Sequence, residues 1–136
     1  MMPKTIAKSD FDRDPNIMWN TVVDLSASGE YDDLSAEQRP AHLVFRYESE
    51  VQNGGHDQYF ENRGTEHLQE TIVALGSLGA NCQQSVLQAA AKRFLKAPDD
   101  ADLSDFDSKF ENCSHSLTGH LENQLAKYQK NFVQVV

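Results

Sequence analysis

Long apolar runs are absent from this sequence: no segment is long enough to cross a membrane, and none near the start resembles a signal peptide. Cysteine is also scarce, because Cys82 and Cys113 are the only two and they form neither a CxxC pair nor a cluster. We therefore expect a cytoplasmic protein that does not bind membranes. Two free, partly buried thiols are the default expectation, and a disulfide between them stays open.

Catalytic and metal-binding motifs are missing as well. The sequence has no GxSxG, no P-loop, no Rossmann glycine run and no HExxH pattern. Four residues match the ligand positions of an EF-hand loop: Asp100, Asp102, Ser104 and Glu111. However, Asp105 occupies the position at which that loop requires glycine. We therefore expect no enzymatic activity, no metal and no cofactor.

Basic residues are few: 12 Lys and Arg stand against 21 Asp and Glu, which gives a formal net charge of −9 at pH 7. Such a field repels nucleic acids and membranes and attracts basic surfaces. Two groups of carboxylates stand out. The first comprises Asp32, Asp33, Glu37, Glu48 and Glu50, and the second comprises Asp99, Asp100, Asp102, Asp105 and Asp107. They either form an ordinary solvated surface or copy the spacing of successive phosphates in a nucleic-acid backbone.

Apolar residues recur at helical spacing along most of the chain, and no useful length alternates with the period of a strand. Ser35 and Gln38 fit a capping box, and glycine or proline separates the later segments. After a polar, loosely ordered lead-in over 1–13, the predicted helices cover 15–28, 40–53, 56–63, 65–79, 81–97, 104–113 and 116–133. We therefore expect an all-α fold, a single compact domain of about six to seven helices spanning residues 1–136.

The most distinctive stretch is Glu-Val-Gln-Asn-Gly-Gly-His-Asp-Gln-Tyr-Phe-Glu-Asn, residues 50–62. Its two glycines permit positive φ, and it contains three amide side chains. One interpretation is structural: a helix ends, the chain turns sharply and a short helix follows. The other is a polar pocket for a small ligand or peptide, floored by glycine backbone. Its binding residues would be Asn53, Gly54, Gly55, Gln58, Tyr59 and Asn62.

The same stretch, written Asn-Gly-Gly-x-x-Gln-Tyr-Phe-x-Asn, resembles the signature of a bacterial all-helical family of largely unknown function that includes a DNA-mimic protein. The sequence departs from that pattern at His56, where Phe is usual. Softer matches, such as Trp19, Tyr47 and Phe94, extend the resemblance over most of residues 15–133. The family resemblance implies a non-enzymatic all-α domain whose acidic surface occupies the DNA site of a basic DNA-binding protein.

Two hypotheses follow. In the first, the chain is an acidic interaction protein, a DNA mimic that binds a repressor or nucleoid protein, blocks its DNA site and does not itself bind nucleic acid. In the second, it is a helical domain that binds a small ligand or peptide in the pocket at the Asn-Gly-Gly motif. A homodimer is left open in both.

Overall fold

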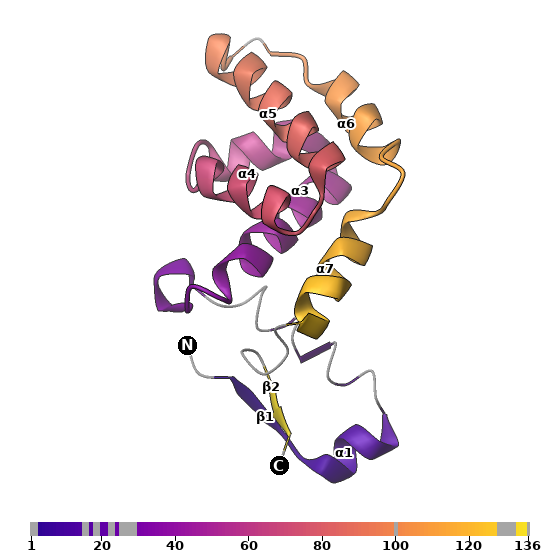
Figure 1. Cartoon of the computed structure of the whole chain (residues 1–136). Coiled ribbons are helices and arrows are strands. Elements are labelled where there is room, and N and C mark those ends of the chain that lie inside the picture. Colours follow the sequence, from indigo (N-terminus) through magenta and orange to yellow (C-terminus); the bar gives the residue numbers. More distant parts are fainter. Residues whose placement is uncertain are drawn as a thin grey trace.

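The computed structural model of the chain describes residues 3–14, 17, 20–21, 24, 30–99, 101–127 and 133–135. Within these residues, six α-helices, one 3₁₀-helix and two short strands form the fold shown in Figure 1. The elements are β1 (Lys4–Ile6), α1 (Lys8–Arg13), η1 (Tyr31–Asp33), α3 (Arg39–Arg63), α4 (Leu68–Ser77), α5 (Asn81–Lys96), α6 (Ser104–Glu111), α7 (Leu117–Lys127) and β2 (Val133–Val135). The all-α prediction is confirmed.

The predicted capping box lies in the turn that leads into α3. The backbone N–H of Ser35 donates to Gln38 Oε1 at 2.9 Å, and the backbone N–H of Gln38 donates to Ser35 Oγ at 3.3 Å. These reciprocal bonds satisfy backbone donors that a helix start leaves without intrahelical partners.

Helix α3 is bent at the motif, because the backbone of Gly54 (φ −155°) and Gly55 (φ +75°) is not helical. The two halves therefore correspond to the helices predicted over 40–53 and 56–63. The second half ends at Gly64, whose φ of +56° is a conformation that residues with a Cβ rarely adopt.

The hydrophobic core lies where α3 contacts α4, α6 and α7, while α5 contacts both α4 and α6. Completely buried apolar or aromatic side chains come from three of these helices: Val44 and Tyr47 of α3, Leu75 of α4, and Leu87 and Ala90 of α5. Phe106 and Phe110 of α6 join the same cluster. Among the described residues, no helix is long and apolar enough to cross a membrane.

The ends of the described chain differ from our expectations. Strands β1 and β2 pair in parallel, with Lys4 opposite Val133 and Ile6 opposite Val135. The expected loosely ordered lead-in thus contains β1 and α1, and Val133 belongs to a strand instead of the helix predicted over 116–133. Three-residue strands are too short to give a readable period. The helix predicted over 15–28 lies largely outside the described residues, although Ile17 and residues 20, 21 and 24 are helical.

The default expectation of free thiols is wrong. Cys82 and Cys113 form a disulfide, with their Cα atoms 5.8 Å apart. Helices α5 and α6 lie side by side and run in opposite directions (Figure 1), which brings the start of α5 beside the end of α6. The pairing depends on this antiparallel arrangement and therefore leaves no local signal in the sequence.

Candidate functional site

The motif is held together by hydrogen bonds to Glu50, which lies in α3 before the bend. Its Oε2 accepts a bond from Gln58 Nε2 at 3.0 Å and another from Asn62 Nδ2 at 2.8 Å, both from the half of α3 that follows the bend. Asn53 Nδ2 and Gln58 Oε1 lie 3.5 Å apart. Because these side chains bond to one another across the bend, their arrangement favours a structural role.

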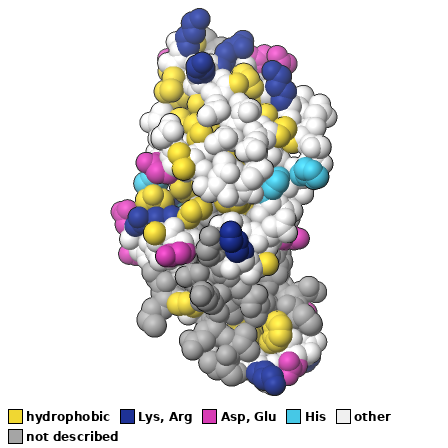
Figure 2. Space-filling model, in the orientation of Figure 1, with side chains coloured by type: hydrophobic (Ala, Val, Ile, Leu, Met, Phe, Trp, Pro, Cys, Tyr) yellow, Lys and Arg dark blue, Asp and Glu magenta, His cyan; other side chains and the backbone are white. Residues whose placement is uncertain are grey.

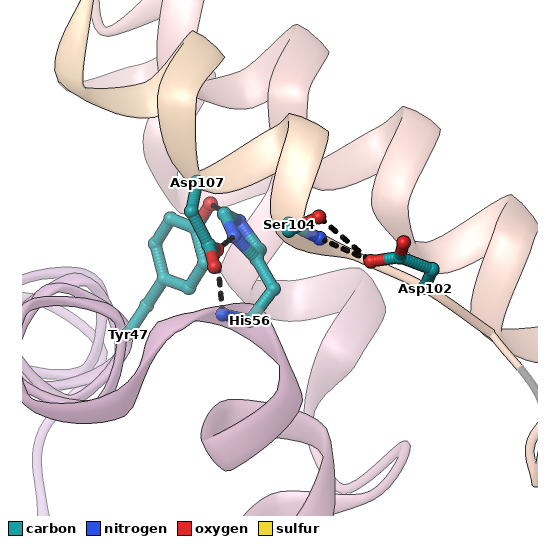
Figure 3. Close-up of polar contacts among 5 residues, drawn as sticks. All are labelled: Tyr47, His56, Asp102, Ser104 and Asp107. Carbon is teal, nitrogen blue, oxygen red and sulfur yellow. Dashed lines mark hydrogen bonds and ion pairs between the residues drawn. The ribbon is translucent and has the colours of Figure 1, made fainter.

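His56 connects the bend to α6 (Figure 3). Its backbone N–H donates to Asp107 Oδ1 at 2.8 Å, and its ring Nδ1 lies 2.6 Å from the same oxygen. Its Nε2 lies 2.7 Å from the Tyr47 hydroxyl. Because an ionised carboxylate only accepts hydrogen bonds, this geometry assigns the proton to Nδ1 and leaves Nε2 to accept from Tyr47.

The surroundings of His56 and Tyr47 favour the neutral form of each side chain. His56 and Tyr47 are completely buried. Burial lowers the pKa of the His56 imidazole, although the hydrogen bond to Asp107 acts in the opposite direction. Burial likewise raises the pKa of the Tyr47 hydroxyl well above its usual value. A neutral imidazole between a phenol and a carboxylate is therefore the resting state.

Gly55 allows this close approach of α6. A Cβ at that position would collide with the carboxylate of Asp107, and its φ of +75° also favours glycine. From the sequence, Gly55 is predicted to line a pocket and His56 stands out only as a departure from the family pattern. The sequence does not predict that Asp107 is the partner of His56, because the two residues are 51 positions apart and no local pattern connects them.

The ten predicted surface carboxylates divide by their contacts. Three are partly buried and accept hydrogen bonds within the chain: Glu48 accepts from the Thr118 hydroxyl, while Glu50 and Asp107 hold the bend. Burial also raises the pKa of Glu48, with the Thr118 bond acting in the opposite direction. Asp100 lies outside the described residues. The remaining six are exposed: Asp32, Asp33, Glu37, Asp99, Asp102 and Asp105.

The exposed carboxylates occupy two separate places. One patch, Asp32, Asp33 and Glu37, lies at η1 and the turn before α3, which we call the α3 patch. The other, Asp99, Asp102 and Asp105, lies between α5 and α6 and at the start of α6, which we call the α6 patch. Figure 1 places these two segments at opposite ends of the helical bundle. On the face shown in Figure 2, acidic side chains are scattered and form no continuous patch.

The residues that match the ligand positions of an EF-hand loop make local contacts. Asp102 Oδ1 accepts bonds from the Ser104 backbone N–H at 3.0 Å and from its hydroxyl at 2.7 Å (Figure 3), which lowers the pKa of Asp102. Among the described residues, no group of three or more His, Cys, Asp or Glu side chains could hold a metal ion. The hydrogen bonds from Ser104, the first residue of α6, therefore account for Asp102 without a metal ion.

Of the six residues predicted to form the motif pocket, Tyr59 lines a cavity between α3 and the start of α4. This cavity has a volume of about 20 Å³, and its lining includes Tyr31, Arg63 and His67. It is a different place from the glycine-floored pocket expected from the sequence.

Comparison with protein families gives one match: residues 32–132 fit the model of the family described as DMP19-like protein. The matched part includes the motif, the disulfide and both acidic patches. Comparison with curated proteins and with solved structures gives no match.

Proposed function

The chain belongs to the DMP19-like family, which includes a DNA-mimic protein, and from this premise we propose that it is an acidic interaction protein that mimics DNA. Its partner would be a basic DNA-binding protein, such as a repressor or a nucleoid protein, whose DNA site it blocks. No chemical step is required of it, since blocking needs only a competing surface.

The observation that carries this proposal is the exposed charge of five carboxylates in the two patches that form no ion pair with a described residue. No described residue forms an ion pair with Asp32, Glu37, Asp99, Asp102 or Asp105, and all five side chains are exposed. Arg93 interacts with the charge of Asp102, but an exposed carboxylate that forms no ion pair still projects its field toward solvent. Such fields steer a basic partner and are screened as salt increases.

The rigid support of the α6 patch adds to this argument. Helix α6 is bound to the bend of α3 by the hydrogen bonds between His56 and Asp107 and to α5 by the disulfide. A fixed scaffold lowers the entropy that would be lost when charges are ordered on binding. The α6 patch is therefore the better candidate for the centre of the interface.

The first experiment is capture of partners from a bacterial lysate at low salt, followed by elution with a salt gradient and identification by mass spectrometry. We expect a DNA-binding protein that elutes as salt rises and that free DNA displaces. An affinity for this partner that is unchanged between low and high salt would contradict mimicry.

Charge variants then test which patch is used. One variant neutralises the α6 patch (Asp99→Asn, Asp102→Asn and Asp105→Asn), and a second neutralises the α3 patch (Asp32→Asn, Asp33→Asn and Glu37→Gln). A matched control neutralises three other exposed carboxylates (Glu61→Gln, Glu111→Gln and Glu122→Gln). We expect at least one patch variant to weaken binding more than the control. Equal weakening of binding by all three variants would show that only the net charge of the chain matters, and it would contradict a specific mimic surface.

A further inference from the structure

A groove with a volume of about 310 Å³ lies between the segment that leads into α3 and helix α4. Because a single water needs only about 10–15 Å³, the groove has room for a whole side chain. Its apolar and aromatic lining comes from η1, from the start of α3 with the turn before it, and from α4: Tyr31, Ala36, Pro40, Leu43, Val73 and Ala74. Figure 2 shows hydrophobic side chains beside acidic and basic ones on this side of the molecule, where Figure 1 places η1.

The groove exposes apolar surface that the fold does not cover. Leu43 and Ala74 are buried at its floor, whereas Val73 is 56% exposed. Among the described residues, the other large hydrophobic side chain with such exposure is Leu95 of α5, at 57%. A single exposed apolar side chain is ordinary, but Val73 lines a groove whose floor is also apolar. An apolar group placed in this groove would therefore remove surface from water on several sides.

The charges beside the groove are mainly negative. Its one described basic lining residue, Arg39, is held by Tyr31, because Arg39 Nε donates to the Tyr31 backbone carbonyl at 3.1 Å and the guanidinium lies 4.6 Å from the centre of the Tyr31 ring. Asp32 and Glu37 directly follow the lining residues Tyr31 and Ala36 in the chain. Both carboxylates are exposed and form no ion pair with a described residue. The apolar groove thus adjoins the α3 patch.

We propose that this groove binds an apolar side chain of the basic protein partner, from a segment in which lysine or arginine residues flank that side chain. The inference rests on the proposed function, because it assigns the groove to the same DNA-binding protein. The carboxylates of the α3 patch would attract the flanking cations, while the groove would bury the apolar side chain. A second copy of the chain is a poor occupant, since it would bring another net charge of −9 against the α3 patch.

Such a groove would select one partner among many basic proteins. Charge steers basic proteins toward an acidic surface without distinguishing well between them. Binding energy at interfaces is concentrated in a few side chains that fill desolvated pockets. The groove would therefore supply the specificity that the exposed carboxylates alone do not.

The test uses three blocked pentapeptides, each titrated into the whole chain at low salt and followed by NMR chemical shifts. Acetyl-Lys-Lys-Leu-Lys-Lys-amide presents a leucine between cations, acetyl-Lys-Lys-Ser-Lys-Lys-amide has the same charge without it, and acetyl-Glu-Glu-Leu-Glu-Glu-amide reverses the charge. We expect the basic leucine peptide to bind at least about tenfold more tightly than the serine peptide, because a leucine side chain is buried. The acidic peptide should not bind. Equal affinities of the two basic peptides, or binding of the acidic one, would overturn the proposal.

Two variants at equally exposed positions identify the groove. Val73→Ser removes apolar surface from the groove, whereas Leu95→Ser removes it from α5, away from this lining. Neither variant changes the charge, and neither side chain belongs to the buried core. We expect the affinity of Val73→Ser for the basic leucine peptide to fall toward that of the serine peptide, and Leu95→Ser to bind as the wild type does. The same affinity in both variants would exclude the groove.

The captured partner gives a second readout. Val73→Ser should weaken its binding by a similar factor at low and high salt, because salt screens charges and not the burial of apolar surface. A salt-sensitive partner that binds Val73→Ser and the wild type equally would overturn the groove and keep the mimic. Capture of no DNA-binding protein would contradict the mimic, while the peptides, which need no partner, would still decide whether the groove takes an apolar side chain between cations.

Discussion

Asp107 accepts two hydrogen bonds from His56, one from the backbone N–H and one from the ring, through a single carboxylate oxygen. The pair joins the bend of α3 to α6 across 51 positions of sequence. Behind it, the Tyr47 hydroxyl completes the set by bonding to the other ring nitrogen. These hydrogen bonds thus join the bend to the helix that carries part of the α6 patch, from the buried Tyr47 and His56 to the partly exposed Asp107.

Removal of the Asp107 carboxylate should therefore destabilise the fold. Asp107→Ala leaves the buried backbone N–H and ring N–H of His56 without an acceptor, and we expect a loss of about 1–3 kcal/mol in the free energy of unfolding. Urea unfolding measures this change. Asp105→Ala on the same helix is the control, because its exposed side chain should change stability by less than about 0.5 kcal/mol. Equal losses in both variants would contradict the structural role of Asp107.

The buried imidazole should also make stability depend on pH. The pKa of His56 is lowered in the folded chain from 6.5, so below pH 6.5 the unfolded chain binds a proton that the folded chain does not. This contribution to stability is present above pH 6.5 and is lost as the pH falls through the folded pKa. We expect the free energy of unfolding to fall between pH 7 and pH 5, measured by urea unfolding at each pH.

The control for this dependence is His56→Phe, which has no titrating group at position 56. Its stability at pH 7 should be lower, because the hydroxyl of Tyr47 and the carboxylate of Asp107 lose their partner. Its stability should nevertheless fall less steeply below pH 6.5 than that of the wild type. Parallel curves for the two proteins would show that His56 does not carry the dependence.

The features that sequence reasoning predicted are local ones. The capping box of Ser35 and Gln38 joins residues three positions apart, and the bend at Gly54 and Gly55 depends on the conformational freedom of those residues themselves. The same reasoning gave the separate helices on either side of the bend and the break between α6 and α7.

The features that sequence reasoning did not predict join distant parts of the chain. The parallel pairing of Lys4 with Val133 and the disulfide across 31 positions exist only because the helices bring their ends together. The cavity lined by Tyr31, Tyr59 and His67 likewise brings together η1, α3 and the residue before α4. Such sites follow from tertiary packing, so periodicity and capping signals contain no information about them.

The disulfide between Cys82 and Cys113 should contribute measurably to stability. Closing a loop of 31 residues restricts the unfolded chain by about 3–4 kcal/mol in the chain-entropy account. We expect a loss of this order in the free energy of unfolding when the wild type is reduced with dithiothreitol. The double variant Cys82→Ser and Cys113→Ser should have the stability of the reduced wild type, and dithiothreitol should not change it further. A wild type unaffected by the reductant would show that the bond is not formed in solution.

The two glycines with positive φ in and after α3 should differ in their tolerance of a methyl group. At Gly64 a Cβ would have no atom within 4 Å of it, so Gly64→Ala meets only the strain of its backbone conformation (φ +56°, ψ −125°), about 1–3 kcal/mol. At Gly55 the same change adds a collision with the carboxylate of Asp107. We expect Gly55→Ala to lose more stability than Gly64→Ala in urea unfolding. The double variant Gly55→Ala with Asp107→Ala should lose less stability than the sum of the losses in the two single variants, because removal of the Asp107 carboxylate relieves the collision. If the losses in free energy of unfolding were strictly additive, a Cβ at position 55 would not collide with the Asp107 carboxylate of α6.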